Sequence, residues 1–415
     1  MVKKVKEGYK KTDIGVIPYN WSMCTLKDIS IGKGDYGIGA SATEYIEGNS
    51  RYLRITDIGD SGRLLNNDIK GLAEDNYEDY LLEDGDIVFA RTGNTTGKSY
   101  VYKNKDGQLV YAGFLIKFTM NKDMVKSNFV KYVIQSKRYW DWVNVMSTRS
   151  GQPGINSNEY STFQVQMPPL NEQQKIAEIL SNVDSQIDDT DKLIEKTKEL
   201  KKGLMSRLLT KGIGHIEFKK TEVGEIPVEW EIRKLGEIGE VVMGQSPVGD
   251  SYNNEEIGTP LLNGPTEFTE KYPIPKQWTT KPTKICKEDD VLFCVRGSSV
   301  GRMNISDNKY CIGRGLAAIR EKNGETSTTY LYYILQKFIN NILNLSVGST
   351  FPNVGKDDLN GLSCIVPPLE EQKKIANILS SVDSDIEEYK NKKIKLEELK
   401  KALMQQLLTG KIRVV

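Results

Sequence analysis

Residues 168–177 read Pro-Pro-Leu-Asn-Glu-Gln-Gln-Lys-Ile-Ala, and residues 367–376 read Pro-Pro-Leu-Glu-Glu-Gln-Lys-Lys-Ile-Ala. The match holds without a gap over residues 168–213 and 367–412, at a constant offset of 199 residues. Of these 46 aligned positions, 26 are identical, so the chain contains an internal duplication. The residues before each copy match poorly, which indicates two diverged domains attached to one repeated element.

Each copy predicts one long helix of about forty residues, which at 1.5 Å each gives a rod of roughly 60 Å. A Pro-Pro pair forces an extended entry, because the residue before a proline is kept out of the α region. Apolar residues then recur at alternating spacings of four and three, which favours a coiled-coil seam over an ordinary core helix. We expect the heptad to slip near residues 193–194 and 393–394. The predicted seam comprises Ile176, Leu180, Val183, Ile187, Leu200 and Leu204 in the first copy, and Ile375, Leu379, Val382, Ile386, Leu399 and Leu403 in the second.

A second repeated stretch opens each half of the chain. Ile-Pro-Tyr-Asn-Trp at residues 17–21 returns as Ile-Pro-Val-Glu-Trp at residues 226–230. The domains that follow, here called heads, contain short apolar runs typical of buried strands and a segment with a helical apolar face, so they are predicted to be mixed α+β. The expected boundaries are a first head at 1–167, a first helix at 168–213, a second head at 214–366 and a second helix at 367–415.

The single histidine is the most restrictive feature of the composition. A Ser/His or Cys/His pair, or a multi-histidine metal site, would have to use His215, which lies in the junction after the first repeated helix. The five cysteines form no Cys-x-x-Cys pair, as expected in a reducing cytosol. We read no signal core and no apolar run of membrane-spanning length, so a cytoplasmic location is expected. No catalytic, cofactor or metal site is expected in this chain.

A turn with two glycines follows an apolar strand in each head. Residues 93–99 imitate a phosphate-binding P-loop but are one residue short, and residues 297–303 replace its lysine and serine, so we expect no nucleotide site. Small polar residues, backbone N–H groups and a cation on a tight turn suit phosphate oxygens or base edges, although a duplicated hairpin turn is the plainer alternative. The candidate DNA contacts here are Arg91, Asn94, Thr96 and Lys98 in the first head, and Arg296, Ser298, Ser299 and Arg302 in the second.

A second matched loop lies just before each Pro-Pro pair. Residues 149–156 and 348–355 share a serine, a proline and an apolar residue, while the polar residues among them differ. A shared framework with variable polar residues is typical of a recognition loop, and a stiff closing loop is the alternative. The candidate contacts in or beside this loop are Arg149, Gln152, Asn156, Thr350, Asn353 and Lys356.

The charge of the chain is locally uneven. A net charge of +1 argues against DNA binding through overall charge. Residues 87–150 nevertheless hold eleven Lys and Arg against three Asp and Glu, whereas residues 51–86 hold four against ten. The first head is therefore expected to have a basic face.

The doubled Pro-Pro-Leu-x-Glu-Gln helix, the two Ile-Pro-x-x-Trp openings and the paired strand–glycine turns resemble the specificity subunit of a type I restriction–modification enzyme. The resemblance covers essentially the whole chain. It implies that each head is a target recognition domain that reads half of a split, asymmetric sequence in double-stranded DNA. It also implies that the two long helices pack antiparallel as a coiled-coil spacer, with a pseudo-two-fold axis relating the two halves.

The same resemblance implies partners and cofactors. Two methyltransferase (modification) subunits are expected to dock on the helices, and restriction subunits to complete the complex. S-adenosylmethionine, ATP and Mg²⁺ are expected on those partners, with this chain as a non-catalytic subunit. A cytosolic coiled-coil scaffold whose two heads bind protein or glycan explains the helices and the neutral charge, but it leaves the paired turns unexplained. A self-sufficient nuclease or methyltransferase fails because its motifs are missing.

Overall fold

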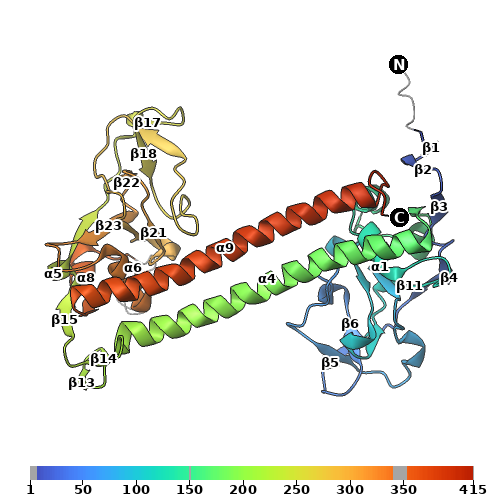
Figure 1. Ribbon diagram of the computed structural model, residues 1–415, viewed down its shortest axis with the longest axis horizontal. Helices are drawn as coiled ribbons and strands as arrows, with labels where there is room; N and C mark the ends of the chain where they lie inside the picture. The colour runs from blue at the N-terminus through green and yellow to red at the C-terminus, as the bar shows by residue number, and fades with distance from the viewer. Residues whose placement is uncertain (1–6, 149–150, 340–352, 415) are drawn as a thin grey trace. The chain divides into compact units, whose positions relative to one another are not determined.

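The computed structural model describes residues 7–148, 151–339 and 353–414, and it divides into two compact units (Figure 1). Unit 1 comprises residues 1–190 and 392–415, so it contains the first head and the end of the chain. Unit 2 comprises residues 191–391 and contains the second head. Each of the two repeated segments contributes one part to each unit.

The head of unit 1 is built on an antiparallel four-stranded sheet in the order β4-β11-β8-β9. Its strands are β1 (Tyr9–Thr12), β2 (Gly15–Pro18), β3 (Ser22–Thr25), β4 (Ser30–Tyr36), β5 (Ala42–Glu44), β6 (Arg51–Leu53), β7 (Lys70–Leu72), β8 (Ile87–Ala90), β9 (Ser99–Val101), β10 (Leu109–Tyr111), β11 (Leu115–Met120) and β12 (Gln164–Met167). Its helices are α1 (Ser127–Val133), α2 (Lys137–Met146) and α3 (Ser157–Ser161), with short 3-10 turns η1 (Ile55–Asp57), η2 (Glu78–Tyr80), η3 (Gly93–Thr95) and η4 (Asn104–Asp106).

Both faces of the central strand β8 are covered, which explains its unbroken apolar run. Ile87 and Phe89 join the cluster formed with the helices, whereas Val88 and Ala90 join a second cluster with β10. Successive side chains of a strand point to opposite faces, so a strand covered on both sides carries no polar alternation. Residues 87–90 are one of the short apolar runs predicted from the sequence to be buried strands, and this prediction is confirmed.

The head of unit 2 repeats this sheet in the order β16-β23-β20-β21. Its strands are β13 (Phe218–Thr221), β14 (Gly224–Pro227), β15 (Glu231–Lys234), β16 (Gly239–Met243), β17 (Tyr252–Asn253), β18 (Thr259–Leu262), β19 (Gln277–Thr279), β20 (Val291–Cys294), β21 (Met303–Ile305), β22 (Cys311–Ile312), β23 (Leu316–Glu321) and β24 (Ser363–Val366). Its helices are α5 (Leu235–Ile238), α6 (Thr328–Lys337) and α8 (Lys356–Asn360), with 3-10 turns η5 (Gly249–Ser251) and η6 (Gly297–Ser299). The mixed α+β class is therefore confirmed in both heads.

The repeated segments form two long helices, α4 (Leu170–Lys211) and α9 (Leu369–Leu407). In unit 1, Leu180 near the start of α4 shares a core cluster with Leu407 at the end of α9. In unit 2 the relation is reversed, because Leu379 near the start of α9 clusters with Leu208 near the end of α4. The helices therefore run antiparallel in each unit. Among the described residues, no helix is both long and apolar enough to span a membrane.

The coiled-coil seam differs from the sequence prediction in its middle. The heptad does not slip: buried or half-buried residues continue the four-three spacing through the whole of both helices. The positions that continue it are Thr190, Ile194, Thr197 and Lys201 in α4, and Tyr389, Lys393, Leu396 and Lys400 in α9. Leu200 and Leu399 were predicted as seam residues, and this prediction is wrong, because their side chains are 55% and 47% exposed.

Two lysines occupy the seam beside those exposed leucines. Lys201 extends from α4 to Asp383 of α9 at 2.6 Å, and Lys400 extends from α9 to Asp184 of α4 at 2.7 Å. A lysine can cover an apolar seam with its stem while its ammonium reaches a carboxylate. A pattern of apolar residues cannot show that a lysine lies in the seam. The prediction from that pattern therefore placed the neighbouring leucines there. The other ten predicted seam positions are buried or half-buried.

The two sequence repeats meet where each head joins its spacer helix. Trp21 of the first opening donates its indole N–H to Glu172 at 2.9 Å, and Trp230 of the second donates to Glu371 at 2.9 Å. The next residue of each long helix is a glutamine, which accepts a backbone N–H group at the point where a helix of the head begins. These residues are Gln173 and Gln372. The repeated motifs therefore fix head to spacer.

A third group completes each of these joints. Arg413 at the end of the chain donates to Glu172 through two nitrogens, at 2.7 and 2.9 Å. In unit 2, His215 lies 2.9 Å from Glu371 through its Nε2 atom. The only histidine of the chain is thus engaged with a carboxylate at a structural joint.

Candidate nucleic-acid interface

The glycine turn of the first head, residues 91–98, is a compact surface turn between β8 and β9. The N–H of Gly97 donates to the carbonyl of Ala90, and the N–H of Lys98 donates to that of Thr95, at 3.0 and 2.9 Å. Gly93 has φ 69°, a left-handed value that favours glycine. The backbone is therefore closed by its own hydrogen bonds, and exposed side chains such as Asn94 project from a fixed base.

The turn of the second head, residues 295–302, follows the same path. The N–H of Gly301 donates to Cys294 and that of Arg302 donates to Ser299, at 2.9 and 3.0 Å. Gly297 has φ 76°, matching the first glycine of the other turn. The alignment of the two turns made from the sequence is confirmed at the level of hydrogen bonds.

The described residues of the two proline loops, 151–156 and 353–355, pack directly against these turns. The N–H of Ile155 donates to Arg91 in the first head, and the N–H of Val354 donates to Val295 in the second, both at 2.9 Å. An isolated antiparallel bridge accompanies each bond, between Thr92 and Gly154 in the first head. Its counterpart joins Arg296 to Asn353. The two matched loops predicted from the sequence thus form one surface in each head.

A third segment, which the sequence analysis missed, completes this surface. In the first head the β11 side of the surface carries Phe114, which is exposed and whose carbonyl accepts the N–H of Arg91 at 3.0 Å. Gly37 packs so closely there that a Cβ atom would lie 2.3 Å from the carbonyl oxygen of Ala112. In the second head Gly244 makes the same approach, 2.2 Å from the carbonyl oxygen of Gly313. These two glycines could have marked the third segment in the sequence if the pairing of the strands had been known.

The predicted contact residues fall into distinct groups in the structure. Those with exposed or half-exposed side chains on the turn-and-loop surface or beside it are Arg91, Asn94, Gln152, Arg296, Ser298, Ser299, Arg302, Asn353 and Lys356. Asn156 is also exposed, but its side-chain oxygen accepts the N–H of Glu159 and caps α3. Arg149 and Thr350 lie outside the described residues.

Two residues of the first turn that were predicted to contact DNA instead interact with other residues of the chain. Thr96 is buried, and its hydroxyl donates to the carbonyl of Gly93 at 2.7 Å, so it closes the turn instead of facing a ligand. Lys98 forms an ion pair with Asp60 at 2.8 Å. The lysine lowers the pKa of Asp60 through a hydrogen bond and its charge. Spacing alone could not reveal these partners, because Asp60 lies far from the turn in sequence.

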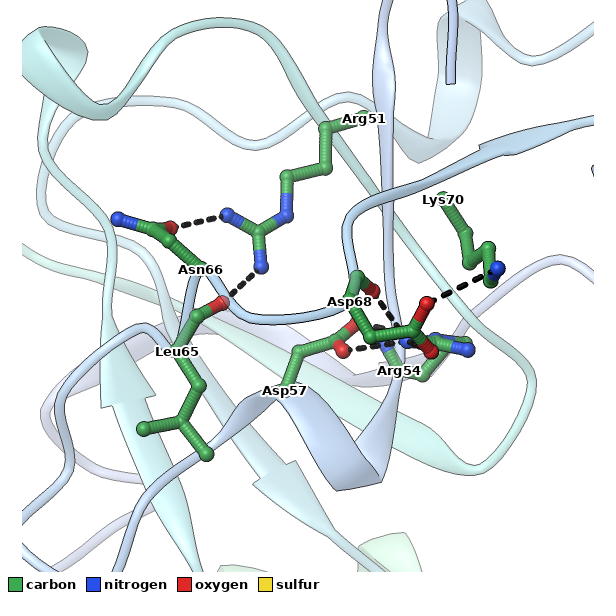
Figure 2. A network of polar contacts seen from close by, with 7 residues as sticks. All are labelled: Arg51, Arg54, Asp57, Leu65, Asn66, Asp68 and Lys70. Atoms are coloured by element: carbon green, nitrogen blue, oxygen red, sulfur yellow. Dashed lines mark hydrogen bonds and ion pairs between the residues drawn. The ribbon is translucent and has the colours of Figure 1, made fainter. Parts of the chain in front are cut away.

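Asp60 belongs to a segment, residues 54–70, that we call the strap. Figure 2 shows the polar network that fixes its two ends. Arg51 donates to Asn66 at 2.7 Å and to the carbonyl of Leu65. Arg54 pairs with Asp57 at 2.7 Å and with Asp68 at 3.1 Å, and Asp68 also pairs with Lys70. Burial lowers the pKa of the Arg51 guanidinium.

The tip of the strap links the turn to the spacer helix. Beside the Asp60–Lys98 pair, the carbonyl of Ser61 accepts a hydrogen bond from Gln135 at 2.8 Å. Arg63 forms an ion pair with Asp188 of α4. The strap thus brings Asp60, one of the acidic residues counted in this region, beside the basic turn, where it neutralises Lys98.

The spacer side of the first head is held by Asp184. Its carboxylate accepts from Lys131 at 2.8 Å and from the Tyr132 hydroxyl at 2.9 Å, and it also pairs with Lys400. Burial alone would raise the pKa of Asp184, but the two ammonium groups lower it to about 2. Tyr333 and Lys201 make the corresponding contacts to Asp383 in the second head.

The described residues hold no group of three or more His, Cys, Asp or Glu side chains able to bind a metal ion. All five cysteines are free thiols, and burial raises the pKa of Cys286 to about 11. The polar groups on the described surface around the turns include backbone amides, hydroxyls, side-chain amides, and ammonium and guanidinium groups. These groups suit hydrogen bonding to phosphates and base edges.

Comparison with known proteins identifies relatives along the whole chain. Residues 18–199 and 227–397 each match the family model of the type I restriction modification DNA specificity domain. The type I restriction enzyme MjaX specificity subunit of Methanocaldococcus jannaschii is 35% identical over 423 residues, covering 99% of this chain and 97% of the relative. The MjaVIII specificity subunit of the same organism is 26% identical over 351 residues, covering 81% of each chain.

Solved structures share the fold. The type I restriction–modification S subunit from M. genitalium superposes with a TM-score of 0.62 at 16% identity, covering 94% of this chain and 96% of that chain. A chain from a structure of type I R-M complex assembly and conformational transition gives a TM-score of 0.57 at 21% identity, covering 95% and 99%.

Proposed function

This chain belongs to the DNA specificity subunits of type I restriction–modification systems, and we propose how its heads and helices divide the work. It is a non-catalytic subunit with two recognition domains that serves DNA sequence recognition. The alternative, a coiled-coil scaffold for protein or glycan, finds no support among the relatives.

We propose that each head reads one half of a bipartite, asymmetric sequence in double-stranded DNA. The observation that supports this proposal is that the turn-and-loop surfaces of the two heads share the same backbone hydrogen bonds, whereas their side chains differ. Thr92 of the first head is replaced by Arg296 in the second, and Gly154 by Asn353. The shared backbone arrangement favours the same mode of approach to DNA in both heads. The different side chains favour recognition of different bases.

The spacer helices are proposed to recruit two methyltransferase subunits, with restriction subunits joining through them. Leu200 and Leu399 support this, because they are the same residue at equivalent positions and both are exposed. Two equal apolar sites suit two copies of one partner. S-adenosylmethionine, ATP and Mg²⁺ would be bound by those partners, and the assembly would act in the cytoplasm, beside the chromosome.

The test is binding of the purified complex of this chain and its methyltransferase subunits to duplex DNA over a range of salt concentrations. If the complex recognises DNA, its affinity for every duplex should fall steeply as the salt concentration rises, since phosphate contacts release counterions. Its affinity for one split sequence should also be much higher than its affinity for other sequences. Equal affinity for all duplexes would contradict sequence recognition, and salt-independent binding would contradict DNA as the ligand.

A further inference from the structure

An arginine of the first head is held on an aromatic ring beside the recognition turn. The guanidinium carbon of Arg91 lies 5.0 Å from the centre of the Tyr36 ring. Tyr36 ends β4 and is 43% exposed, while its hydroxyl accepts the backbone N–H of Ser157 at 3.2 Å. The ring is thus anchored at its hydroxyl end, and its face supports the guanidinium.

The hydrogen-bonding capacity of this guanidinium is not used by any residue that the structure describes. Its Nε atom is buried without a partner, and within residues 7–148, 151–339 and 353–414 the Arg91 side chain has no ion pair or hydrogen bond. Lys98 and Thr96, by contrast, are both engaged. A stacked guanidinium with unused donors loses little conformational freedom when it binds a ligand.

The second head changes both members of this pair together. Strand register places Met243 at the position of Tyr36, because Met243 pairs with Ala317 as Tyr36 pairs with Ile116. Val295, which is buried, takes the position of Arg91. The loss of the guanidinium thus coincides with the loss of the ring that would support it.

Exposed cations appear elsewhere on the second surface. Arg296 stands one position later than the equivalent of Arg91, and Arg314 lies on the neighbouring turn, where its N–H donates to Ser246 at 3.3 Å. The two heads therefore present guanidinium groups at different points of one frame. A group that contacted only phosphate would have no reason to move between heads, since the backbone of DNA is the same for every sequence.

We propose that Arg91 reads a guanine in the major groove, with Tyr36 as the positioning residue that holds its fork in the plane of the base edge. The O6 and N7 acceptors of guanine match the two parallel donors of a guanidinium. This inference rests on the proposed function and specifies the ligand of the first surface.

The test uses the full complex with its methyltransferase subunits and duplexes that carry each of the four bases at every position of the first half-site. For Arg91→Ala the preference for guanine at one position should fall about 10- to 100-fold, with the second half-site unchanged. Tyr36→Phe should keep the preference, because the ring remains, whereas Tyr36→Leu should reduce it without a change in salt slope. Lys105→Ala, which removes an exposed cation in η4 beyond the far end of β9, is the matched control.

Other outcomes separate this proposal from the proposed function. Equal weakening of all duplexes with a salt slope lower by about one would make Arg91 a phosphate contact and overturn the guanine assignment. Unchanged binding in Arg91→Ala would remove it from the interface and also overturn the assignment. Either result leaves DNA recognition by the wild-type complex intact, whereas a wild-type complex without any sequence preference would overturn both proposals.

Discussion

At the scale of single residues, the recognition surface depends on partners that lie far apart in sequence. The sequence correctly matched the two turns and the two proline loops, because glycine and proline positions mark turns directly. It could not show that Asp60 neutralises Lys98, that Thr96 points inward, or that Tyr36 supports Arg91. These relations follow from strand pairing and the path of the strap, which no local pattern encodes.

The Asp60–Lys98 pair predicts a gain in DNA affinity on removal of the acid. In Asp60→Asn the ammonium of Lys98 becomes available to a phosphate, so binding to random duplex should strengthen and its salt slope should steepen by about 0.9. Titration of fluorescent duplex at several salt concentrations measures both. Asp75→Asn is the control, since Asp75 is an exposed acid of the same head outside the strap. An equal effect in the two variants would show a general charge effect instead.

Asp184 predicts a pH-dependent contribution to stability. Its folded pKa of about 2 lies below the ordinary aspartate value of 3.8, so its stabilisation is complete above pH 4 and disappears as the pH falls towards 2. Asp184→Asn should therefore lower the free energy of unfolding by about 2 kcal/mol at pH 7, and by progressively less below pH 4. Urea unfolding of both proteins from pH 7 to pH 2.5 checks this. A difference that stays constant with pH would exclude the ion pairs as its source.

At the scale of elements, the two helices form a seam that mixes leucines with lysine–aspartate pairs. The apolar pattern predicted the two helices and most seam positions, since amphipathic periodicity is the strongest signal a sequence carries. It failed at Lys201 and Lys400, because a charged residue on a helix is usually a surface residue. These two lysines are exceptions because they form ion pairs with Asp383 and Asp184.

The seam predicts that charge inside it separates the helices. Leu180 and Leu379 are fully buried, one in each unit, so Leu180→Asp with Leu379→Asp places two unpaired carboxylates in apolar clusters. Each change should cost about 3 kcal/mol or more and abolish recruitment of the methyltransferase subunits. Thermal unfolding and size-exclusion chromatography with the partner subunits measure the two effects. An intact complex of normal size would rule out the coiled-coil spacer.

The matched control replaces the two exposed leucines. Leu200→Asp with Leu399→Asp makes the same chemical change on the outer face of the helices. The melting temperature should stay within a few degrees of wild type, because surface substitutions change stability by only about 0.5 kcal/mol. Recruitment of methyltransferase subunits should nevertheless be lost. Retained recruitment would place the docking surface elsewhere on the chain.

At the scale of the whole molecule, the chain is an internal duplication with almost no net charge. Each half repeats one joint, in which a tryptophan and a glutamate fix head to spacer, and one turn-and-loop surface. The side chains of the two surfaces differ, whereas the tryptophan–glutamate contact of the joint and the lysine–aspartate pairs of the seam recur in both halves. The near balance of charge, 57 cations against 56 anions, is consistent with partner subunits that supply much of the phosphate contact.

If the two heads read separate halves of one target, exchange of one head must change one half alone. This division is tested by sequencing the methylated sites in cells that express the partner subunits with a chimaera. In that chimaera, residues 1–165 come from another specificity subunit. One half of the methylated sequence should change to that of the donor while the other half remains as in wild type. A change in both halves, or in neither, would contradict it.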